Sequence, residues 1–438
     1  MNKSTSVPTE SAPARPTFWE AFRFWLKLGF ISFGGPAGQL SIMHAELVER
    51  KRWISENRFF HALNFCMLLP GPEAQQVAIY IGWLLHRTWG GIAAGALFVL
   101  PSAFLLWALS FVYMRYGDVP AVAAVFYGLQ SAVVAIVAAA VLRIGSKALK
   151  NGILWGVAGL AFAAIFFLKV PFVAIILAAG AIGFAGGRFF PEKFLIAQGH
   201  GGTESVLADE EASLERPTWG RAVRVASICL ALWWLPILAV GLWSGWEGIL
   251  FQQGLFFSKA ALVTFGGAYA VLPYVAQQAV ENYGWLSTGQ MMAGLGLAET
   301  TPGPLIMVLQ FVGFVGAWQN PGNMDPLFAA TWGAAVTTWA TFLPCFLFVF
   351  LGAPYIERLR NVKTLTAVLS TITAAVVGVV LNLAVWFGWH VIFPAGVDGF
   401  ALAASLIFFL GMVRWKWGII TVVFTASLVG LAYRLAAG

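Results

Sequence analysis

FGGPAGQLSIMHAELVERKRWISENRFFHALNFCMLLPGP (residues 33–72) begins with Phe-Gly-Gly, ends with Pro-Gly-Pro, and has a matching partner later in the chain. The same two tripeptides recur in the second half with the same spacing, as Phe265-Gly266-Gly267 and Pro302-Gly303-Pro304. Each copy places helix breakers inside sequence that otherwise resembles the core of a membrane protein. Interrupted hydrophobic segments at corresponding positions of two halves are typical of transporters, and they mark the binding site.

The composition predicts an all-α polytopic membrane protein. Hydrophobic residues make up 60% of the chain and charged residues only 10%, against about 25% charged in a typical soluble domain. Several stretches without any charged residue are long enough for the roughly 20 residues that cross a bilayer as a helix. These stretches are 89–114, 121–142, 225–246, 327–354 and 364–389. They are continuous rather than alternating, which excludes a transmembrane β-barrel.

The remaining polar and sulfur-containing residues fit this class. The net charge is +7, but in a polytopic chain basic residues mainly mark cytoplasmic loops, so we expect no nucleic-acid partner. Residues 1–16 lack the apolar core of a signal peptide and are predicted to be a disordered cytoplasmic tail. Cys66, Cys229 and Cys345 lie apart in apolar surroundings. We therefore expect buried thiols, no disulfide, no metal site and no cofactor.

The chain divides into two repeats joined by a linker and one additional helix. A polar, acidic segment at 189–218 separates two long hydrophobic regions. The predicted organisation is a tail at 1–16, a first repeat at 17–188, a cytoplasmic linker at 189–220, a linking transmembrane helix at 221–245 and a second repeat at 246–438.

Basic residues predict that the two repeats have inverted topology. The loop after the first Gly-Gly pair is strongly basic, whereas the matching loop at 276–290 has no basic residue. At the other end, the loop near Arg115 has one basic residue and its counterpart has three. The basic residues concerned are Arg50, Lys51, Arg52 and Arg58 in the first repeat and Arg358, Arg360 and Lys363 in the second. Because basic loops stay on the cytoplasmic side, equivalent loops should face opposite sides of the membrane.

This orientation predicts broken helical hairpins followed by spanning helices in each repeat. The hairpins are expected at 18–48, 59–87, 247–280 and 288–319, with turns at the duplicated tripeptides. Spanning helices are expected at 89–115, 119–143, 151–168, 170–187, 221–244, 327–352, 364–390, 396–413 and 415–436. Whether the hairpins are re-entrant or pairs of full spans is open at this point.

Two lysines are candidates for binding an anion. Lys27 and Lys259 occupy equivalent positions in the two repeats, each within a hydrophobic segment. A charged side chain in the membrane costs on the order of 3 kcal/mol, so its presence suggests a function. Two symmetry-related lysines near the midplane could enclose an oxyanion. The alternative is that both extend to the membrane interface, and Arg23 could anchor there in the same way.

The tripeptides themselves supply further binding groups. Interrupting a helix frees backbone N–H groups and exposes the positive end of the next half-helix, which together bind anions. Gly34, Gly35, Gly266 and Gly267 allow close backbone approach and positive φ. The predicted breaks comprise Pro70, Gly71, Pro72, Pro302, Gly303 and Pro304, with Pro72 and Pro304 suited to a first helical turn. The alternative is that the glycines only allow tight helix packing.

Polar residues next to the breaks complete the candidate site. Gln75, Gln76, Thr300 and Thr301 are neutral groups suited to hydrogen-bonding a tetrahedral oxyanion. Glu73 and Glu299 would repel an anion unless protonated, which makes them candidates for proton coupling. An equally good alternative for Glu73 is a capping role at the start of the half-helix.

The runs FGGPAGQLSIMHAELVERKRWISENRFFHALNFCMLLPGPEAQQVAIYIGWLLH (33–86), FGGAYAVLPYV (265–275) and GLAETTPGPLIMVLQFVGF (296–314) resemble the two halves of the chromate ion transporter family, long-chain type. The resemblance extends over most of 17–436 and weakens in the linker and the later spans. It implies a multi-pass carrier of the bacterial inner membrane that exports chromate, driven by the membrane potential or the proton gradient, and so confers chromate resistance. It also implies sulfate as a competing oxyanion.

Other functions remain as alternatives. A carrier of sulfate or another oxyanion, or an anion channel, could use the same site, and a homodimer is compatible with the sequence. An intramembrane enzyme is disfavoured because no HExxH, GxGD or Ser–His arrangement occurs. ATP-driven export is disfavoured because the chain has no GxxxxGK[ST] loop.

Overall fold

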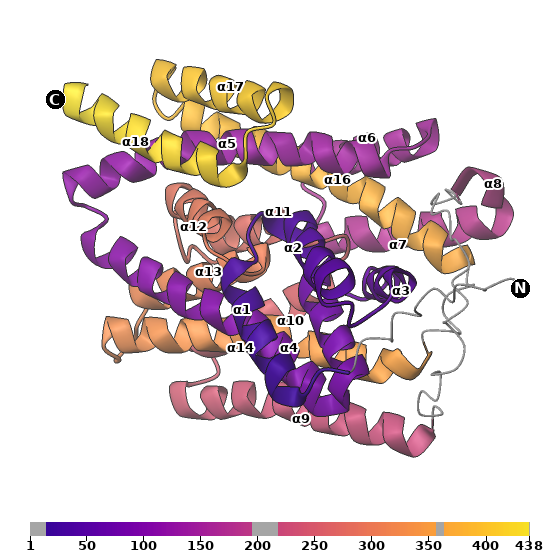
Figure 1. Cartoon of the computed structure of the whole chain (residues 1–438). Helices are drawn as coiled ribbons and strands as arrows, with labels where there is room; N and C mark the ends of the chain where they lie inside the picture. The colour runs from indigo at the N-terminus through magenta and orange to yellow at the C-terminus, as the bar shows by residue number, and fades with distance from the viewer. Residues whose placement is uncertain (1–14, 195–217, 356–362, 438) are drawn as a thin grey trace, which may run out of the picture.

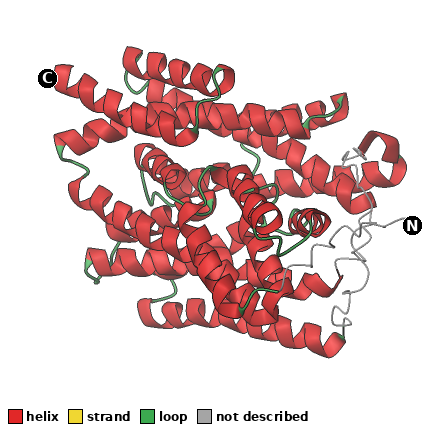
Figure 2. Ribbon diagram, in the orientation of Figure 1, coloured by secondary structure: helices red, strands yellow, loops and turns green. Residues whose placement is uncertain are grey.

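The computed structural model describes residues 15–194, 218–355 and 363–437, and regular structure in these ranges is helical throughout (Figures 1 and 2). Nearly all of the predicted tail, most of the acidic linker, and Arg358 and Arg360 lie outside them. Within the described ranges, seven helices are long and apolar enough to cross a membrane. The prediction of an all-α polytopic membrane protein is therefore confirmed.

The first repeat has broken helices at its start and long helices at its end. Its elements are α1 (Phe18–Ile31), α2 (Gly35–His44), the π-helix η1 (Ala45–Arg50), α3 (Glu56–Cys66), α4 (Glu73–Tyr116), α5 (Pro120–Ala148), α6 (Gly152–Phe166), α7 (Phe172–Phe189) and the short α8 (Pro191–Phe194). The helix α9 (Trp219–Ser244) corresponds to the predicted linking helix. Most boundaries lie within a few positions of those expected, but α5 continues to Ala148, beyond its expected end at residue 143.

The second repeat follows the same order. Its elements are α10 (Ile249–Leu262), α11 (Ala268–Ala276), the π-helix η2 (Gln277–Asn282), α12 (Thr288–Thr300), the 3-10 helix η3 (Leu305–Met307), α13 (Val308–Gln319), α14 (Pro326–Gly352), the 3-10 helix η4 (Ala353–Tyr355), α16 (Lys363–Ile392), α17 (Gly399–Arg414) and α18 (Ile419–Ala437). The offset between the two π-helices equals the offset between the tripeptides beside them. π-Helices are rare, so a π-helix at the same position of both repeats shows that the repeat extends to backbone detail. Those that do occur often lie at functional sites.

Helix caps explain why some polar residues recur in both copies. Ser55 and Ser287 are the N-caps of α3 and α12, and their hydroxyl oxygens accept hydrogen bonds from Arg58 N (3.3 Å) and Gln290 N (3.2 Å). Each cap satisfies a backbone donor that has no partner within its own helix. The duplicated serines therefore define where the third helical segment of each repeat begins.

The long helix α4 consists of two helices that fold back on each other. His86 (φ −137°, ψ 31°) and Arg87 (φ 52°, ψ −146°) are non-helical. The two halves then pack so closely that a Cβ on Gly82 or Gly90 would collide with the carbonyl oxygen of the other. In the second repeat, α13 and α14 meet in the same way at Gly313 and Gly333. The chain therefore reverses direction near residue 87, where the second expected hairpin ends.

The short helices lie in the centre of the molecule, surrounded by long ones. In Figure 1, α2, α3, α11 and α12 lie between a group containing α5, α6 and α16 and a group containing α9 and α14. The helix α1 has 14 residues and α3 has 11, fewer than the roughly 20 that a full span requires. Their lengths are those of half-helices.

Long helices of the two repeats pack reciprocally. Helix α5 of the first repeat packs against α17 and α18 of the second, and α16 of the second repeat packs against α6 and α7 of the first. Small residues allow these contacts, because Gly128 of α5 meets Gly430 of α18, and Gly378 of α16 meets the backbone of Ala158 in α6. Close approach of this kind is how helices associate in lipid. Each repeat is therefore completed by the helices of the other.

Candidate functional site

The duplicated tripeptides form breaks with left-handed backbone, as predicted for the glycines. In the first repeat φ is +90° at Gly34, +68° at Gly35 and +124° at Gly71. The second repeat has +80° at Gly266, +93° at Gly267 and +104° at Gly303. Only glycine adopts such angles without strain, so these residues are required by the turns.

Pro72 and Pro304 lie one residue earlier than expected. Both are N-caps, with extended backbone (φ −71°, ψ 110° and φ −63°, ψ 132°), and helix begins at the next residue. A proline is tolerated here because the first amide groups of a helix have no partner within the helix. Glu73 is consequently the first residue of α4.

The breaks of the two repeats meet through a reciprocal pair of hydrogen bonds. Gly71 N–H donates to the carbonyl oxygen of Thr264 (2.8 Å), and Gly303 N–H donates to that of Ser32 (2.7 Å). Ser32 and Thr264 immediately precede the two Phe-Gly-Gly tripeptides and are equivalent in the repeat. Each Pro-Gly-Pro turn is thus tied to the Gly-Gly break of the other half. The four breaks, which are far apart in sequence, therefore meet in two reciprocal pairs between the repeats, and this region is called the centre below.

The hydroxyl groups of Ser32 and Thr264 also bond to the last turns of α1 and α10 in the same way. The hydroxyl of Ser32 donates to Leu28 O (2.7 Å), and that of Thr264 donates to Ala260 O (2.6 Å). Both side chains are fully buried. Their own carbonyl groups are left to accept the hydrogen bonds from Gly71 and Gly303, which is how the short polar residues support the centre.

Glu73 and the two glutamines lie at this centre. Glu73 Oε1 is 3.9 Å from where a Cβ on Gly267 would be, so the carboxyl group faces the break of the second repeat. Gln76 Nε2 donates to Pro70 O (2.7 Å) and stabilises its own turn. Gln75 is fully buried, and neither polar atom of its amide has a hydrogen-bond partner among the described residues. Gln75 is therefore the glutamine that is free to bind a ligand.

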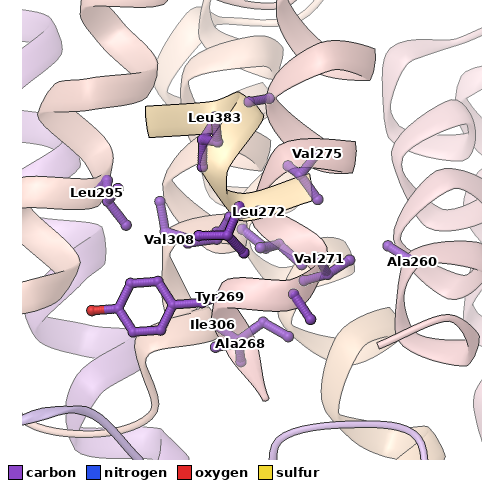
Figure 3. Close-up of a cluster of buried hydrophobic side chains, with 14 of the residues drawn as sticks. Ala260, Ala268, Tyr269, Val271, Leu272, Val275, Leu295, Ile306, Val308 and Leu383 are labelled. Atoms are coloured by element: carbon purple, nitrogen blue, oxygen red, sulfur yellow. The ribbon is translucent and has the colours of Figure 1, made fainter. Parts of the chain in front are cut away.

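Glu299 is buried near the second break and interacts with residues of both repeats. Its side chain is 4% exposed and accepts a hydrogen bond from the hydroxyl of Tyr269. The guanidinium carbon of Arg143 lies 5.9 Å from the centroid of the Tyr269 ring, so a cation of the first repeat lies beside the Tyr269–Glu299 pair. In Figure 3 the Tyr269 hydroxyl points away from the apolar side chains around α11. This group joins α5 of the first repeat to α11 and α12 of the second.

The other candidates lie outside the buried centre or already have partners. Lys27 and Lys259 are exposed on α1 and α10, and Arg23 is exposed on α1. The hydroxyl of Thr300 donates to Leu297 O (2.8 Å) and that of Thr301 to Ala298 O (3.1 Å). Only the oxygen lone pairs of these threonines remain for another partner.

Sequence reasoning did not include Arg143 or Tyr269 in the site. The uncharged run stops at residue 142, which predicts that the span ends at Arg143. The helix instead continues to Ala148, so the arginine lies within it. No clear signal of this continuation was present in the sequence, because Gly145 and Ser146, shortly after Arg143, favour a turn. Tyr269 gave no signal, since an aromatic residue in an apolar segment normally packs in the core.

The fold and the site together define a polytopic membrane protein built from two copies of one unit, with a polar centre where their helix breaks meet. The chain belongs to the chromate transporter family, whose model matches residues 19–184 and 251–431. The offset between the starts of the two matched regions equals the offset between the tripeptides. The family is one of transporters and not of enzymes.

Curated relatives resemble the chain over most of its length. A chromate transport protein of Pseudomonas aeruginosa is 32% identical over 98% of this chain and 95% of its own. A chromate transport protein of Cupriavidus metallidurans is 31% identical over 83% and 81%, and a probable chromate transport protein of Synechococcus elongatus is 29% identical over 84% and 83%. No solved structure matches the chain. An all-α protein of this class belongs to the bacterial inner membrane, since outer-membrane proteins are β-barrels.

Proposed function

We propose that the chain is a secondary carrier that exports chromate from the bacterial cell and so confers chromate resistance. The family and the names of the curated relatives support the substrate. The observation that carries the location of the binding site is the reciprocal pair of hydrogen bonds from Gly71 to Thr264 and from Gly303 to Ser32. These bonds bring the helix breaks of both repeats together.

The centre formed by the breaks suits a dianion. Glycine-rich breaks followed by helix starts present backbone N–H groups and a partial positive charge. The free amide of Gln75 adds a neutral donor. Lys27 and Lys259 would attract the anion from the exposed faces of α1 and α10 towards this centre. Glu73 and Glu299 would carry the coupling proton, because a buried carboxylate repels an anion until it is protonated.

The reciprocal contacts also support inverted topology. Two equivalent hydrogen bonds, each from one repeat to the other, are what a two-fold relation between the repeats produces. When such an axis lies in the membrane plane, the binding centre lies near the midplane and the two repeats can move against each other for alternating access.

Uptake of labelled chromate into inside-out vesicles tests the proposal. Export in the cell becomes uptake in these vesicles, and we expect it to require an energised membrane, to stop on addition of an uncoupler and to be competed by excess sulfate. Uptake of labelled sulfate without chromate uptake would identify a sulfate carrier instead. Flux that ignores the uncoupler and shows no saturation would identify a channel. Vesicles without the protein provide the control.

A further inference from the structure

We propose that Arg143 binds the transported oxyanion directly and supplies the positive charge beside the Gly266-Gly267 break. The inference rests on the proposed function and adds a binding residue to it. Arg143 comes from α5 of the first repeat, whereas the break it serves, Gly266-Gly267, belongs to the second. The site would therefore be completed across the repeats.

The guanidinium group has unused hydrogen-bonding capacity. Its Nη2 atom is buried and has no hydrogen-bond partner among the described residues. A guanidinium has five N–H donors in a planar fork, and a buried donor without a partner is costly. Since the protein around Arg143 leaves this donor unsatisfied, a ligand rich in acceptor oxygens would complete it. A tetrahedral oxyanion can accept two parallel N–H bonds from such a fork.

The neighbours of Arg143 hold it beside the break. Tyr269 is the second residue of α11, directly after Ala268, and the guanidinium carbon of Arg143 lies 5.9 Å from its ring centroid. Tyr269 donates to Glu299, which is buried and provides the opposite charge that keeps a cation in this apolar region. Thr373 of α16 lies near the same break, with its hydroxyl oxygen 3.6 Å from where a Cβ on Gly266 would be.

The group does not recur in the other copy, which argues against a purely architectural role. Residues needed for the repeat fold are duplicated, including the glycines of the breaks and the N-cap serines. At the offset of the tripeptides, the positions equivalent to Tyr269 and Glu299 are Ala37 and Met67. The second repeat contains an insertion after its breaks, so its later helices follow a larger offset. Aligning Pro101-Ser102 with Pro344-Cys345 gives this offset, and Arg143 then corresponds to Trp386. The ionisable group is thus present once.

Equilibrium binding of labelled chromate to the purified full chain tests this inference. Arg143→Gln should raise the Kd by about 10- to 100-fold, as expected for loss of a charge-assisted hydrogen bond. Arg143→Lys keeps the charge but not the fork, so its Kd should lie in between. The matched control is Arg115→Gln, which removes the same charge from an exposed position at the end of α4 and should leave the Kd within twofold of wild type.

A double variant separates binding from a structural role. Arg143→Gln leaves Glu299 buried without a nearby positive charge, so the folding of this variant is checked by size-exclusion chromatography. If the single variant aggregates, the double variant Arg143→Gln/Glu299→Gln is measured in its place. The double variant should also bind chromate at least tenfold more weakly than Glu299→Gln alone. Equal Kd values for these two variants, or an Arg143→Gln variant that binds like wild type, would overturn the inference about Arg143 and leave the proposed function standing. A wild-type protein that binds neither chromate nor sulfate would overturn the proposed function and the inference with it.

Discussion

Residues at the centre differ in whether the hydrogen-bond donors of their side chains have partners, and this difference separates structural residues from candidate binding residues. Ser32, Thr264 and Gln76 donate to backbone carbonyls of their own segments and hold the breaks in place. Gln75 Nε2 and Arg143 Nη2 are buried donors without partners among the described residues, whereas the unpaired atom of Gln76 is Oε1, an acceptor that an anion cannot use. Because unsatisfied buried groups are rare in folded proteins, these two side chains are where a ligand is expected.

Replacing the duplicated lysines tests their part in transport. Lys27→Ala and Lys259→Ala should each reduce chromate efflux to the level of cells without the protein, because each removes one of two equivalent positive charges. Chromate uptake by inside-out vesicles is the measurement, with immunoblotting of membranes to confirm insertion. Lys150→Ala, which removes an exposed lysine after α5, is the control. Near-normal export by both variants would exclude a part for the lysines in transport.

Replacing Glu299 tests proton coupling. If Glu299 carries the coupling proton, chromate binding to wild type should weaken as pH rises, because the deprotonated carboxylate repels the dianion and competes for Arg143. Glu299→Gln mimics the protonated form, so its binding should be nearly independent of pH, and chromate uptake driven by the membrane potential should lose its dependence on pH. Glu73→Gln is measured in parallel. A Glu299→Gln variant whose uptake keeps the wild-type dependence on pH would leave Glu73 as the coupling candidate.

At the scale of elements, the decisive feature is that each repeat begins with half-length helices that end at glycine or proline breaks. These helices cannot cross the membrane alone, and their broken ends require partners. The ends find them in the other repeat, through the bonds between Gly71 and Thr264 and between Gly303 and Ser32. The breaks are therefore the joint between the repeats, and this joint is where we propose that the anion binds.

A methyl group at one break should disrupt this joint. A Cβ on Gly303 would lie 2.5 Å from Cβ of Ser102, and its φ of +104° is unfavourable for any other residue. Gly303→Ala should therefore cost about 1–3 kcal/mol of stability and abolish chromate uptake. The thermal unfolding midpoint of the purified protein measures the first effect. Gly156→Ala is the control, because a Cβ there has open space; equal losses in both variants would contradict this explanation.

At the scale of the whole molecule, two similar units complete each other. The reciprocal packing of α5 with α17 and α18, and of α16 with α6 and α7, means that neither repeat has a closed surface of its own. Small residues at these contacts let the backbones approach closely. Motion of one unit against the other would change the centre between them, as alternating access requires.

Cysteine labelling tests the inverted orientation. Glu49 and Glu281 occupy equivalent, exposed positions at the ends of the two π-helices. In a background without Cys66, Cys229 and Cys345, Glu49→Cys and Glu281→Cys should react with a membrane-impermeant maleimide from opposite sides. Glu49→Cys should be protected in intact cells and labelled in inside-out vesicles, and Glu281→Cys should show the reverse. Labelling of both from one side would refute inverted topology.

The sequence determined the class, the repeat and the identity of the breaks. Long uncharged runs permit only membrane helices, and duplicated tripeptides identify the repeat without any knowledge of contacts. Only the tertiary structure decided which groups share the centre. It joined each break to the other repeat, turned Lys27 and Lys259 to exposed faces, and brought Arg143 to Tyr269 and Glu299. The physical reason is that breaking a helix is a local property of glycine and proline, whereas the partner of a broken end or a buried charge depends on how distant helices pack.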